Sequence, residues 1–209
     1  MFDKKKSSAC FVINIFAIVL SSCLYAAQPD NGIAVSSHSS YSPDFIEFKD
    51  ISGLSTAYPA YFDLLDPAVF QSFVPEKASR EHKMKIIFFA LNKASGEPKI
   101  IIARSEYRKG MNIEQILKAI NNDSELLGGI QETWQQQIEG DSALTETSAI
   151  TSDGDIFISK SKLFLVNSAD AKNVVVYQIS AGATFNDYYK YLSVIDAVMQ
   201  NSRFNYGGK

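Results

Sequence analysis

The sequence predicts an α+β domain, with one antiparallel sheet of five or six strands and helices on both faces, a three-layer α/β/α sandwich. The main observation is a pair of apolar runs, residues 84–91 (MKIIFFAL) and 99–107 (KIIIARSEY), on either side of a connection that carries Ser95-Gly96. This arrangement is typical of an antiparallel hairpin. Neither run alternates with polar residues, so we expect helices to cover both faces of these strands.

The segment before this hairpin predicts irregular strands and one short helix. Residues 45–48 alternate weakly, and Pro59 restricts residues 53–62 to an edge strand or a broken strand. Asp66-Pro67 has the form of a helix N-cap followed by proline at the first helical position. The charged residues 80–85 are expected to form an exposed loop that leads into the hairpin.

Two helices are predicted directly after the hairpin. The first runs from Ile113 to Ile120, where apolar residues repeat along one helical face, and Asn112 and Gln115 stand at the positions of a capping box. Residues 124–139 repeat apolar side chains at positions 130, 134 and 138, which predicts the second helix.

The C-terminal part predicts a meander of three strands closed by a helix. Residues 145–150 and 156–166 flank the hairpin signal Asp153-Gly154, and residues 174–180 form the third strand. Thr184 and Asp187 resemble a capping box at the start of a helix that ends near position 202. The core is expected to combine the helices over residues 113–120 and 185–199 with five sheet residues: Ile87, Phe89, Ile101, Val175 and Tyr177.

The N-terminus predicts export. Lys4, Lys5 and Lys6 precede an apolar run over residues 9–20, which is shorter than the ~20 residues that a membrane-spanning helix needs. This is the layout of a secretory signal peptide. We expect a signal peptide over residues 1–22, a flexible Ser- and Pro-rich tether over residues 23–44, and a single globular domain over residues 45–209.

The sequence around Cys23 predicts whether the mature protein is attached to a membrane. Residues 20–23 (LSSC) resemble a bacterial lipobox, in which the cysteine thiol receives diacylglycerol, so we predict lipid attachment at Cys23 and a location in the cell envelope. The alternative is ordinary cleavage near Ala26 or Ala27, which gives a soluble periplasmic or secreted protein. Because Cys10 and Cys23 are the only cysteines, neither form contains an intramolecular disulfide.

Charge and motifs argue against several functional classes. A net charge of −3 without a basic cluster beyond the N-terminus disfavours nucleic-acid binding. The sequence contains none of the patterns HExxH, GxxxxGK[ST], GxGxxG and GxSxG, so no motif supports a zinc peptidase, an NTPase, a dinucleotide enzyme or a serine hydrolase. Asp153-Gly154-Asp155 lacks the further acidic ligands of a calcium loop. We therefore predict no metal site and no cofactor.

A few side chains remain as candidates for function. His82 stands among lysines and arginines and is interpreted as a solvated residue. Glu106, Glu114 and Glu132 are candidate acid–base groups, although nothing in the sequence pairs them. Exposed tyrosines provide rigid contact area at protein interfaces. The candidate partner surface consists of four tyrosines: Tyr58, Tyr61, Tyr189 and Tyr191.

The order of the predicted elements resembles a known family. Strands, a helix opened by GMNIEQILKAI (110–120), a hairpin meander and a closing helix that ends in SRF (202–204) are similar to the fold of PsbP, the extrinsic photosystem subunit, and its exported bacterial relatives. The resemblance covers residues 46–204 and implies a non-catalytic binding or assembly subunit.

These observations together predict an exported module, not an enzyme, that is lipid-anchored and binds a protein partner in the bacterial envelope. The alternative is a soluble periplasmic or secreted protein, including an enzyme with an unrecognised carboxylate site.

Overall fold

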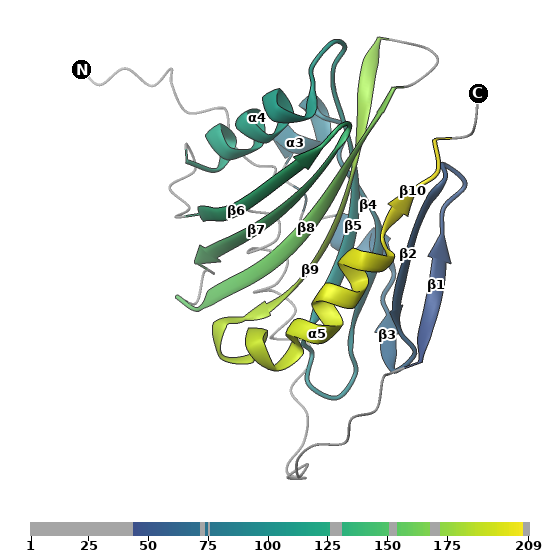
Figure 1. Ribbon diagram of the computed structural model, residues 1–209, viewed down its shortest axis with the longest axis vertical. Coiled ribbons are helices and arrows are strands. Elements are labelled where there is room, and N and C mark those ends of the chain that lie inside the picture. The colour runs from purple at the N-terminus through teal and green to yellow at the C-terminus, as the bar shows by residue number, and fades with distance from the viewer. Residues whose placement is uncertain are drawn as a thin grey trace.

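The computed structural model shows a mixed α+β domain with two antiparallel sheets (Figure 1). It describes residues 44–71, 74, 76–125, 131–150, 154–167 and 172–206. Among these residues, seven strands form the main sheet in the order β3 (Phe62–Leu64), β4 (Lys85–Asn92), β5 (Lys99–Arg108), β9 (Asn173–Thr184), β8 (Ile156–Asn167), β7 (Ser142–Ile150) and β6 (Gln131–Glu139). A small sheet has the order β1 (Phe45–Lys49), β2 (Leu54–Pro59) and β10 (Arg203–Phe204).

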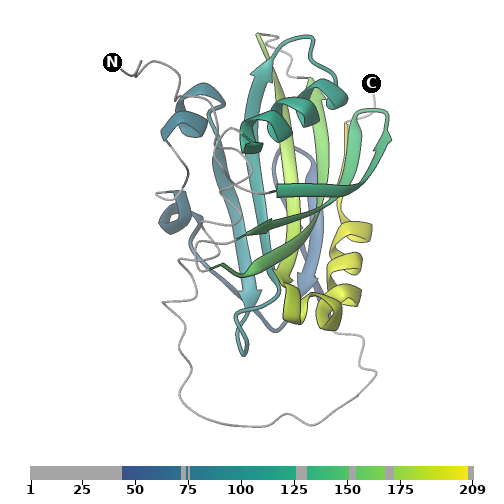
Figure 2. The same cartoon turned by 90° about the vertical axis from the view of Figure 1, so that its left-hand side faces the viewer.

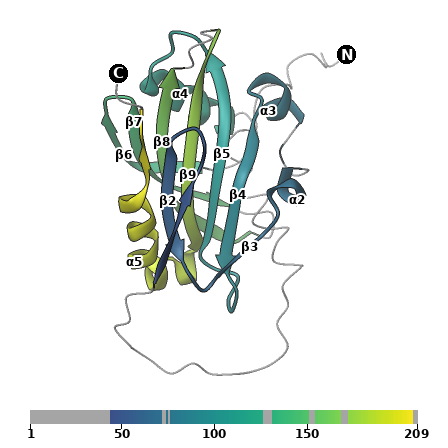
Figure 3. The same cartoon turned by 90° about the vertical axis from the view of Figure 1, so that its right-hand side faces the viewer.

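Four helices accompany the sheets in the described part of the chain: α2 (Pro67–Gln71), α3 (Glu76–Glu81), α4 (Ile113–Glu125) and α5 (Phe185–Asn201). One face of the main sheet packs against α2 and α4 (Figure 2). The other face packs against α5 and the small sheet, which lie side by side (Figure 3). Within the described residues, no helix has the length and apolar character needed to cross a membrane.

Each face of the main sheet therefore has its own hydrophobic core. Phe89 and Ile101 belong to the core under α2 and α4, whereas Ile100 and Ile102 belong to the core under α5 and the small sheet. All four side chains are fully buried. The expectation that the non-alternating strands are covered on both faces is confirmed.

The hairpin and the helix that follows it agree with the sequence prediction. β4 and β5 pair antiparallel, from Lys85 opposite Arg104 to Leu91 opposite Lys99. At the start of α4, the Gln115 N–H donates to Asn112 Oδ1 at 2.9 Å, and the Asn112 N–H donates to Gln115 Oε1 at 3.0 Å. The predicted capping box is therefore present.

The predicted helix start at Asp66-Pro67 and the predicted meander are also confirmed. The Ala68 N–H donates to Asp66 Oδ1 at 2.9 Å, as an N-cap requires. β7, β8 and β9 follow one another as antiparallel neighbours. Gly154, between β7 and β8, has φ +86°, the left-handed conformation that favours glycine in such turns.

The sheet is larger and the helices are fewer than a three-layer α/β/α sandwich implies. Instead of one sheet of five or six strands, the described residues form sheets of seven and three strands. The small sheet covers part of the face on which we expected helices alone. Of the five predicted core residues, four are buried, and Ile87 is half-buried because it lies at a bulge between Ile86 and Phe88.

The predicted helix over residues 124–139 is wrong for its second half. Gln131–Glu139 is strand β6, paired with β7 from Gln131 opposite Ala149 to Glu139 opposite Ser142. Apolar residues four positions apart lie near one face of a helix, but they also lie on one face of a strand, because four is a multiple of two. A bulge between Thr133 and Gln135 further disturbs the alternation.

Two other helix boundaries differ from the prediction. Residues 80 and 81, expected in an exposed loop, complete α3, and α4 continues beyond Ile120 to Glu125. Thr184 stands at the N-cap of α5, but its side chain makes no hydrogen bond to the helix. Its N–H and its hydroxyl both donate at 2.9 Å to Oε2 of Glu97, a buried side chain in the β4–β5 turn.

Polar side chains fix α5 against the sheet. Lys160 Nζ lies 2.6 Å from Asp196 Oδ1, and the Tyr188 hydroxyl donates to Glu146 Oε1 at 2.6 Å. Burial, followed by the hydrogen bond to Glu146, raises the pKa of Tyr188 well above its usual value, so the phenol stays protonated. Lys162 Nζ donates to the Ser202 carbonyl at 2.8 Å, at the C-terminal end of the helix.

Truncation of Phe89 to alanine tests the core. The Phe89 ring stacks on that of Phe70, with their centroids 4.1 Å apart. We expect Phe89→Ala to lower the free energy of unfolding by about 3–5 kcal/mol, the range for buried aromatic residues. Denaturant titration of both proteins measures this change. A loss below about 1 kcal/mol would contradict the assigned burial.

Candidate functional site

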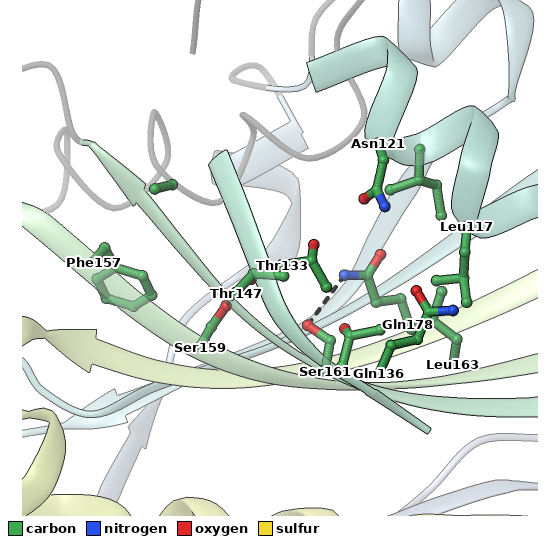
Figure 4. A pocket seen from close by; sticks show the side chains of 13 residues that line it. Leu117, Asn121, Thr133, Gln136, Thr147, Phe157, Ser159, Ser161, Leu163 and Gln178 are labelled. Atoms are coloured by element: carbon green, nitrogen blue, oxygen red, sulfur yellow. Dashed lines mark hydrogen bonds between the residues drawn. The ribbon is translucent and has the colours of Figure 1, made fainter. Parts of the chain in front are cut away.

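A polar recess lies between α4 and the main sheet (Figure 4). Apolar side chains from α4 and β8 form part of its lining, among them Leu117, Ile120 and Leu163. The remainder consists mainly of hydroxyl and amide groups that project from β6, β7, β8 and β9. Its described lining residues carry no charged group, imidazole or thiol.

Strand register explains why the hydroxyl groups gather there. Thr145 pairs with Ser161, which pairs with Ser180, and in the next row Thr147 pairs with Ser159. Directly paired residues of antiparallel strands point to the same face of the sheet. The Ser161 and Ser180 hydroxyl oxygens are 2.6 Å apart, and those of Thr147 and Ser159 are 3.1 Å apart.

These polar groups satisfy one another within the sheet. The Gln178 amide donates to the Ser180 hydroxyl at 3.1 Å and to the Ser161 hydroxyl at 3.3 Å. The enclosed space is ≈ 30 Å³, which is room for one or two water molecules. The recess therefore offers neutral hydrogen-bonding groups but neither an acid–base pair nor an activated nucleophile.

Of the three candidate carboxylates, the structure describes the side chains of Glu106 and Glu114. Glu106 accepts hydrogen bonds from Lys83 at 2.8 Å, Asn173 at 3.0 Å and Arg104 at 3.1 Å. The bond from Lys83 contributes most to lowering the pKa of Glu106 to about 2, so the carboxylate stays ionised and paired. Glu114 is exposed on α4, and the side chain of Glu132 lies outside the described part of the structure.

His82 is not the solvated residue that its charged neighbours indicated. The imidazole is half-buried and stacks on the Tyr107 ring with 4.6 Å between centroids. Its Nδ1 lies 3.2 Å from the Glu106 carbonyl oxygen. Among the described residues, no group of three or more His, Cys, Asp and Glu side chains is placed to hold a metal ion.

The four predicted tyrosines do not share one surface. Tyr58 is only 7% exposed and packs against Phe88, with ring centroids 5.2 Å apart, so it belongs to the core. Tyr61 is exposed, and Tyr189 is 68% exposed. Tyr191 is half-buried, and its hydroxyl donates to Ser95 Oγ at 3.2 Å.

Three further apolar side chains are exposed near Tyr189. Phe185 is 52% exposed, and its ring lies 6.4 Å from that of Tyr189, edge to face. Ile150 and Ile156 are exposed and paired across β7 and β8. Thr184 of β9 pairs with Phe157 of β8. Phe185, which follows Thr184, and Ile156, which precedes Phe157, are therefore neighbours at the same end of the sheet.

Tyr61 and Tyr191 lie at this same end of the domain. Phe62, which follows Tyr61, pairs with Asn92 at the start of the β4–β5 turn, and the Tyr191 hydroxyl donates to Ser95 in the same turn. Burial and, to a smaller extent, the phenol of Tyr191 raise the pKa of Tyr61. The lower part of Figure 1 holds the start of α5, the β4–β5 turn and the start of β1. We call this surface the aromatic end, defined by six residues: Tyr61, Ile150, Ile156, Phe185, Tyr189 and Tyr191.

Phe185 and the two isoleucines were not among the sequence-predicted surface residues. Phe185 fits the apolar spacing of α5 and therefore reads as a core residue, but it is the first residue of the helix and lies beyond the sheet that buries the later turns. Cys23, the predicted lipid attachment site, lies outside the described residues.

No protein-family model matches the chain, and neither does any curated protein sequence. Among solved structures, the cyanobacterial PsbP protein CyanoP of Synechocystis is 9% identical over 82% of this chain and 98% of its own, with a TM-score of 0.50. LpqN of Mycobacterium tuberculosis, a protein involved in cell envelope biogenesis, is 13% identical over 78% of this chain and 91% of its own, with a TM-score of 0.49. The Ran-binding protein Mog1p of Saccharomyces cerevisiae is 12% identical over 78% and 96%, with a TM-score of 0.47.

This chain has the PsbP-like fold. The element order read from the sequence is confirmed at the level of architecture. At such low identity, this similarity concerns the PsbP-like fold alone, and one fold supports many functions.

The Glu106 cluster predicts a specific dependence of stability on pH. Because the pKa of Glu106 falls from its ordinary 4.5 to about 2 on folding, its contribution is fully present above about pH 4.5 and is lost as the pH falls toward 2. We expect Glu106→Gln to lower the free energy of unfolding by about 1–3 kcal/mol at pH 7, with the difference shrinking below pH 4.5.

Urea titrations between pH 2.5 and 7 measure this dependence. Glu114→Gln is the matched control, because it removes the same charge from an exposed position in the first turn of α4 and is expected to change stability by less than about 1 kcal/mol. An equal loss for Glu106→Gln at every pH would show that the effect does not come from ionisation.

Proposed function

We propose that this protein is an exported, non-catalytic binding module that is held at a membrane by a lipid on Cys23 and binds a protein partner through the aromatic end. The observation that carries the proposal is the exposure of Phe185 and Tyr189 beside Ile150 and Ile156. Large apolar side chains gathered on one surface mark interaction sites more often than scattered ones do.

The composition of the aromatic end fits a protein interface. Tyrosine and phenylalanine are enriched at the centre of such interfaces, and charged residues are enriched at the rim. Here the aromatic rings are bordered by two ion pairs, Lys190 with Asp187 at 3.7 Å and Lys93 with Asp63 at 3.8 Å. Exposed pairs of this kind add little affinity but restrict which partners fit.

The described polar sites support a binding role over an enzymatic one. Glu106 is held by three donors, and the recess under α4 is lined by neutral groups, several of which hydrogen-bond to one another. An enzyme with a carboxylate site would need two carboxylates in a shared cavity with different pKa values. The alternative is a soluble periplasmic or secreted protein without a lipid on Cys23, including an enzyme with an unrecognised carboxylate site.

Replacement of exposed aromatic residues tests the binding surface. We expect the double variant Phe185→Ser/Tyr189→Ser to reduce the fraction of protein in a larger complex by at least tenfold, because interface aromatics contribute about 2 kcal/mol or more each. Native electrophoresis of the mildly solubilised envelope measures this fraction.

The matched control for this experiment is Ile51→Ser. Ile51 is fully exposed in the β1–β2 turn, at the opposite end of the domain. Its replacement removes apolar surface without changing the aromatic end, so the complex should persist. Equal losses for both variants would indicate a non-specific effect of surface polarity.

Replacement of Cys23 tests the lipid anchor. We expect wild-type protein to incorporate a labelled fatty acid and to sediment with membranes, and Cys23→Ser to lose the label and become soluble, because several acyl chains are needed for stable anchoring. Thermal unfolding of the two proteins should agree, since we expect position 23 to precede the globular domain. Unlabelled, soluble wild-type protein would instead support cleavage near Ala26 or Ala27.

A further inference from the structure

We infer that four basic side chains, separate from the aromatic end, form a second surface that binds the anionic headgroups of a lipid bilayer. This inference rests on the proposed location at a membrane, but not on the aromatic end. We call the surface the basic face, defined by Lys83, Lys85, Arg104 and Arg108. Strand β5 starts from the β4–β5 turn and ends at Arg108, so the basic face and the aromatic end lie at opposite ends of the domain.

Strand register brings the four residues together, although they come from two separate segments of the sequence. Lys85 of β4 pairs directly with Arg104 of β5, so the two side chains share one face of the sheet. Arg108 follows four positions after Arg104 in the same strand and therefore lies on that face too. Lys83 Nζ donates at 2.8 Å to Glu106, which stands between the two arginines on the same face.

The layers that cover this side of the sheet end before they reach the basic face. Ile100 and Ile102, on the same face in the first half of β5, are fully buried under α5 and the small sheet. Figure 3 shows that β5 and β9 extend beyond both of these layers. Here Lys85 and Arg108 are exposed, and the side chain of Lys83 is 63% exposed. The second half of β5 therefore presents charged side chains where the first half presents isoleucines.

The basic face carries a surplus of positive charge, although the chain as a whole is acidic. Glu106 Oε2 lies 2.8 Å from Lys83 Nζ, and Glu106 Oε1 lies 3.1 Å from the Arg104 guanidinium. This carboxylate compensates one of the four positive charges, which leaves a surplus of three on a chain whose formal net charge is −3. The neighbouring end of α3 adds Arg80 and Glu81, one charge of each sign.

This composition matches an anionic bilayer better than it matches a protein surface. Protein interfaces are built around aromatic and apolar side chains, whereas all four residues of the basic face are charged. Attraction to anionic headgroups requires only lysine and arginine near the bilayer, and each strengthens binding about fivefold. A surplus of three charges therefore gives roughly a hundredfold preference for an anionic bilayer over a neutral one.

Lysine footprinting on lipid vesicles tests this inference. Purified wild-type protein is mixed with vesicles of phosphatidylcholine, alone or with phosphatidylglycerol, and mass spectrometry follows the acetylation of each lysine. Lys190 is the internal control, because its side chain is 64% exposed and paired with a carboxylate, as is that of Lys83. We expect Lys83 and Lys85 to react about threefold or more slowly on the anionic vesicles, and Lys190 to react equally on both. About 1 M salt, which shortens the screening length to ~3 Å, should abolish the difference.

Two double variants locate the binding surface. Lys85→Gln/Arg108→Gln removes two charges from the basic face and should lower the affinity for anionic vesicles about 25-fold, so Lys83 should lose its protection. Lys93→Gln/Lys190→Gln is the matched control, because it removes the same charge from the aromatic end. In this control, Lys83 should remain protected on the anionic vesicles.

Three outcomes would overturn the inference and leave the proposed function standing. The first is equal reactivity of Lys83 and Lys85 on both kinds of vesicle. The second is equal protection of Lys83 and Lys190 on the anionic vesicles, which would place the contact elsewhere. The third is protection of Lys83 by soluble polyphosphate but not by vesicles, which would assign the basic face to a soluble polyanion. Absence of a fatty-acid label on Cys23 would instead contradict the proposed lipid anchor.

Discussion

Burial of both faces of β5 and β9 is the constraint on which the rest of the structure depends. These strands pair from Lys99 opposite Gly182 to Arg108 opposite Asn173, and they supply buried side chains to both cores. A sheet of this kind is stable only when each face is covered. One face is covered by α2 and α4. The other requires more area than α5 provides, and β1, β2 and β10 cover the remainder.

The position of α5 then decides which side chains remain exposed. Glu97 holds the first turn, the Tyr188 hydroxyl is bound to Glu146, and Lys162 caps the final carbonyls, so the helix has a fixed rotation against the sheet. Tyr188 is directed inward, and Tyr189, about 100° further round the helix, lies on the solvent side with 68% of its surface exposed. The exposure of Tyr189 thus follows from the same contacts that fix the helix.

The sequence predicted those elements whose signals are local. The capping box at Asn112, the glycine at position 154 between paired strands and the doubly apolar hairpin each depend on neighbouring residues, and all three agree with the structure. The prediction is wrong where contacts distant in sequence decide the structure. The apolar spacing of β6 fits both a helix and a strand, and pairing with β7 makes it a strand. The hydroxyl of Thr184 donates to a carboxylate 87 positions away instead of to the helix that follows it. Tyr58 was predicted to be exposed, but Phe88 covers it, and no local pattern reports that contact.

The central claim is that the aromatic end is occupied where the protein works. Hydroxyl-radical footprinting of the intact envelope, compared with the purified domain, tests it most directly. Phe185 at 52% and Tyr206 at 53% exposure have nearly equal access to solvent but lie at opposite ends of the domain. We predict that Phe185 and Tyr189 are oxidised several-fold more slowly in the envelope, whereas Tyr206 is unchanged. Equal oxidation of Phe185 and Tyr189 in both settings would contradict the account.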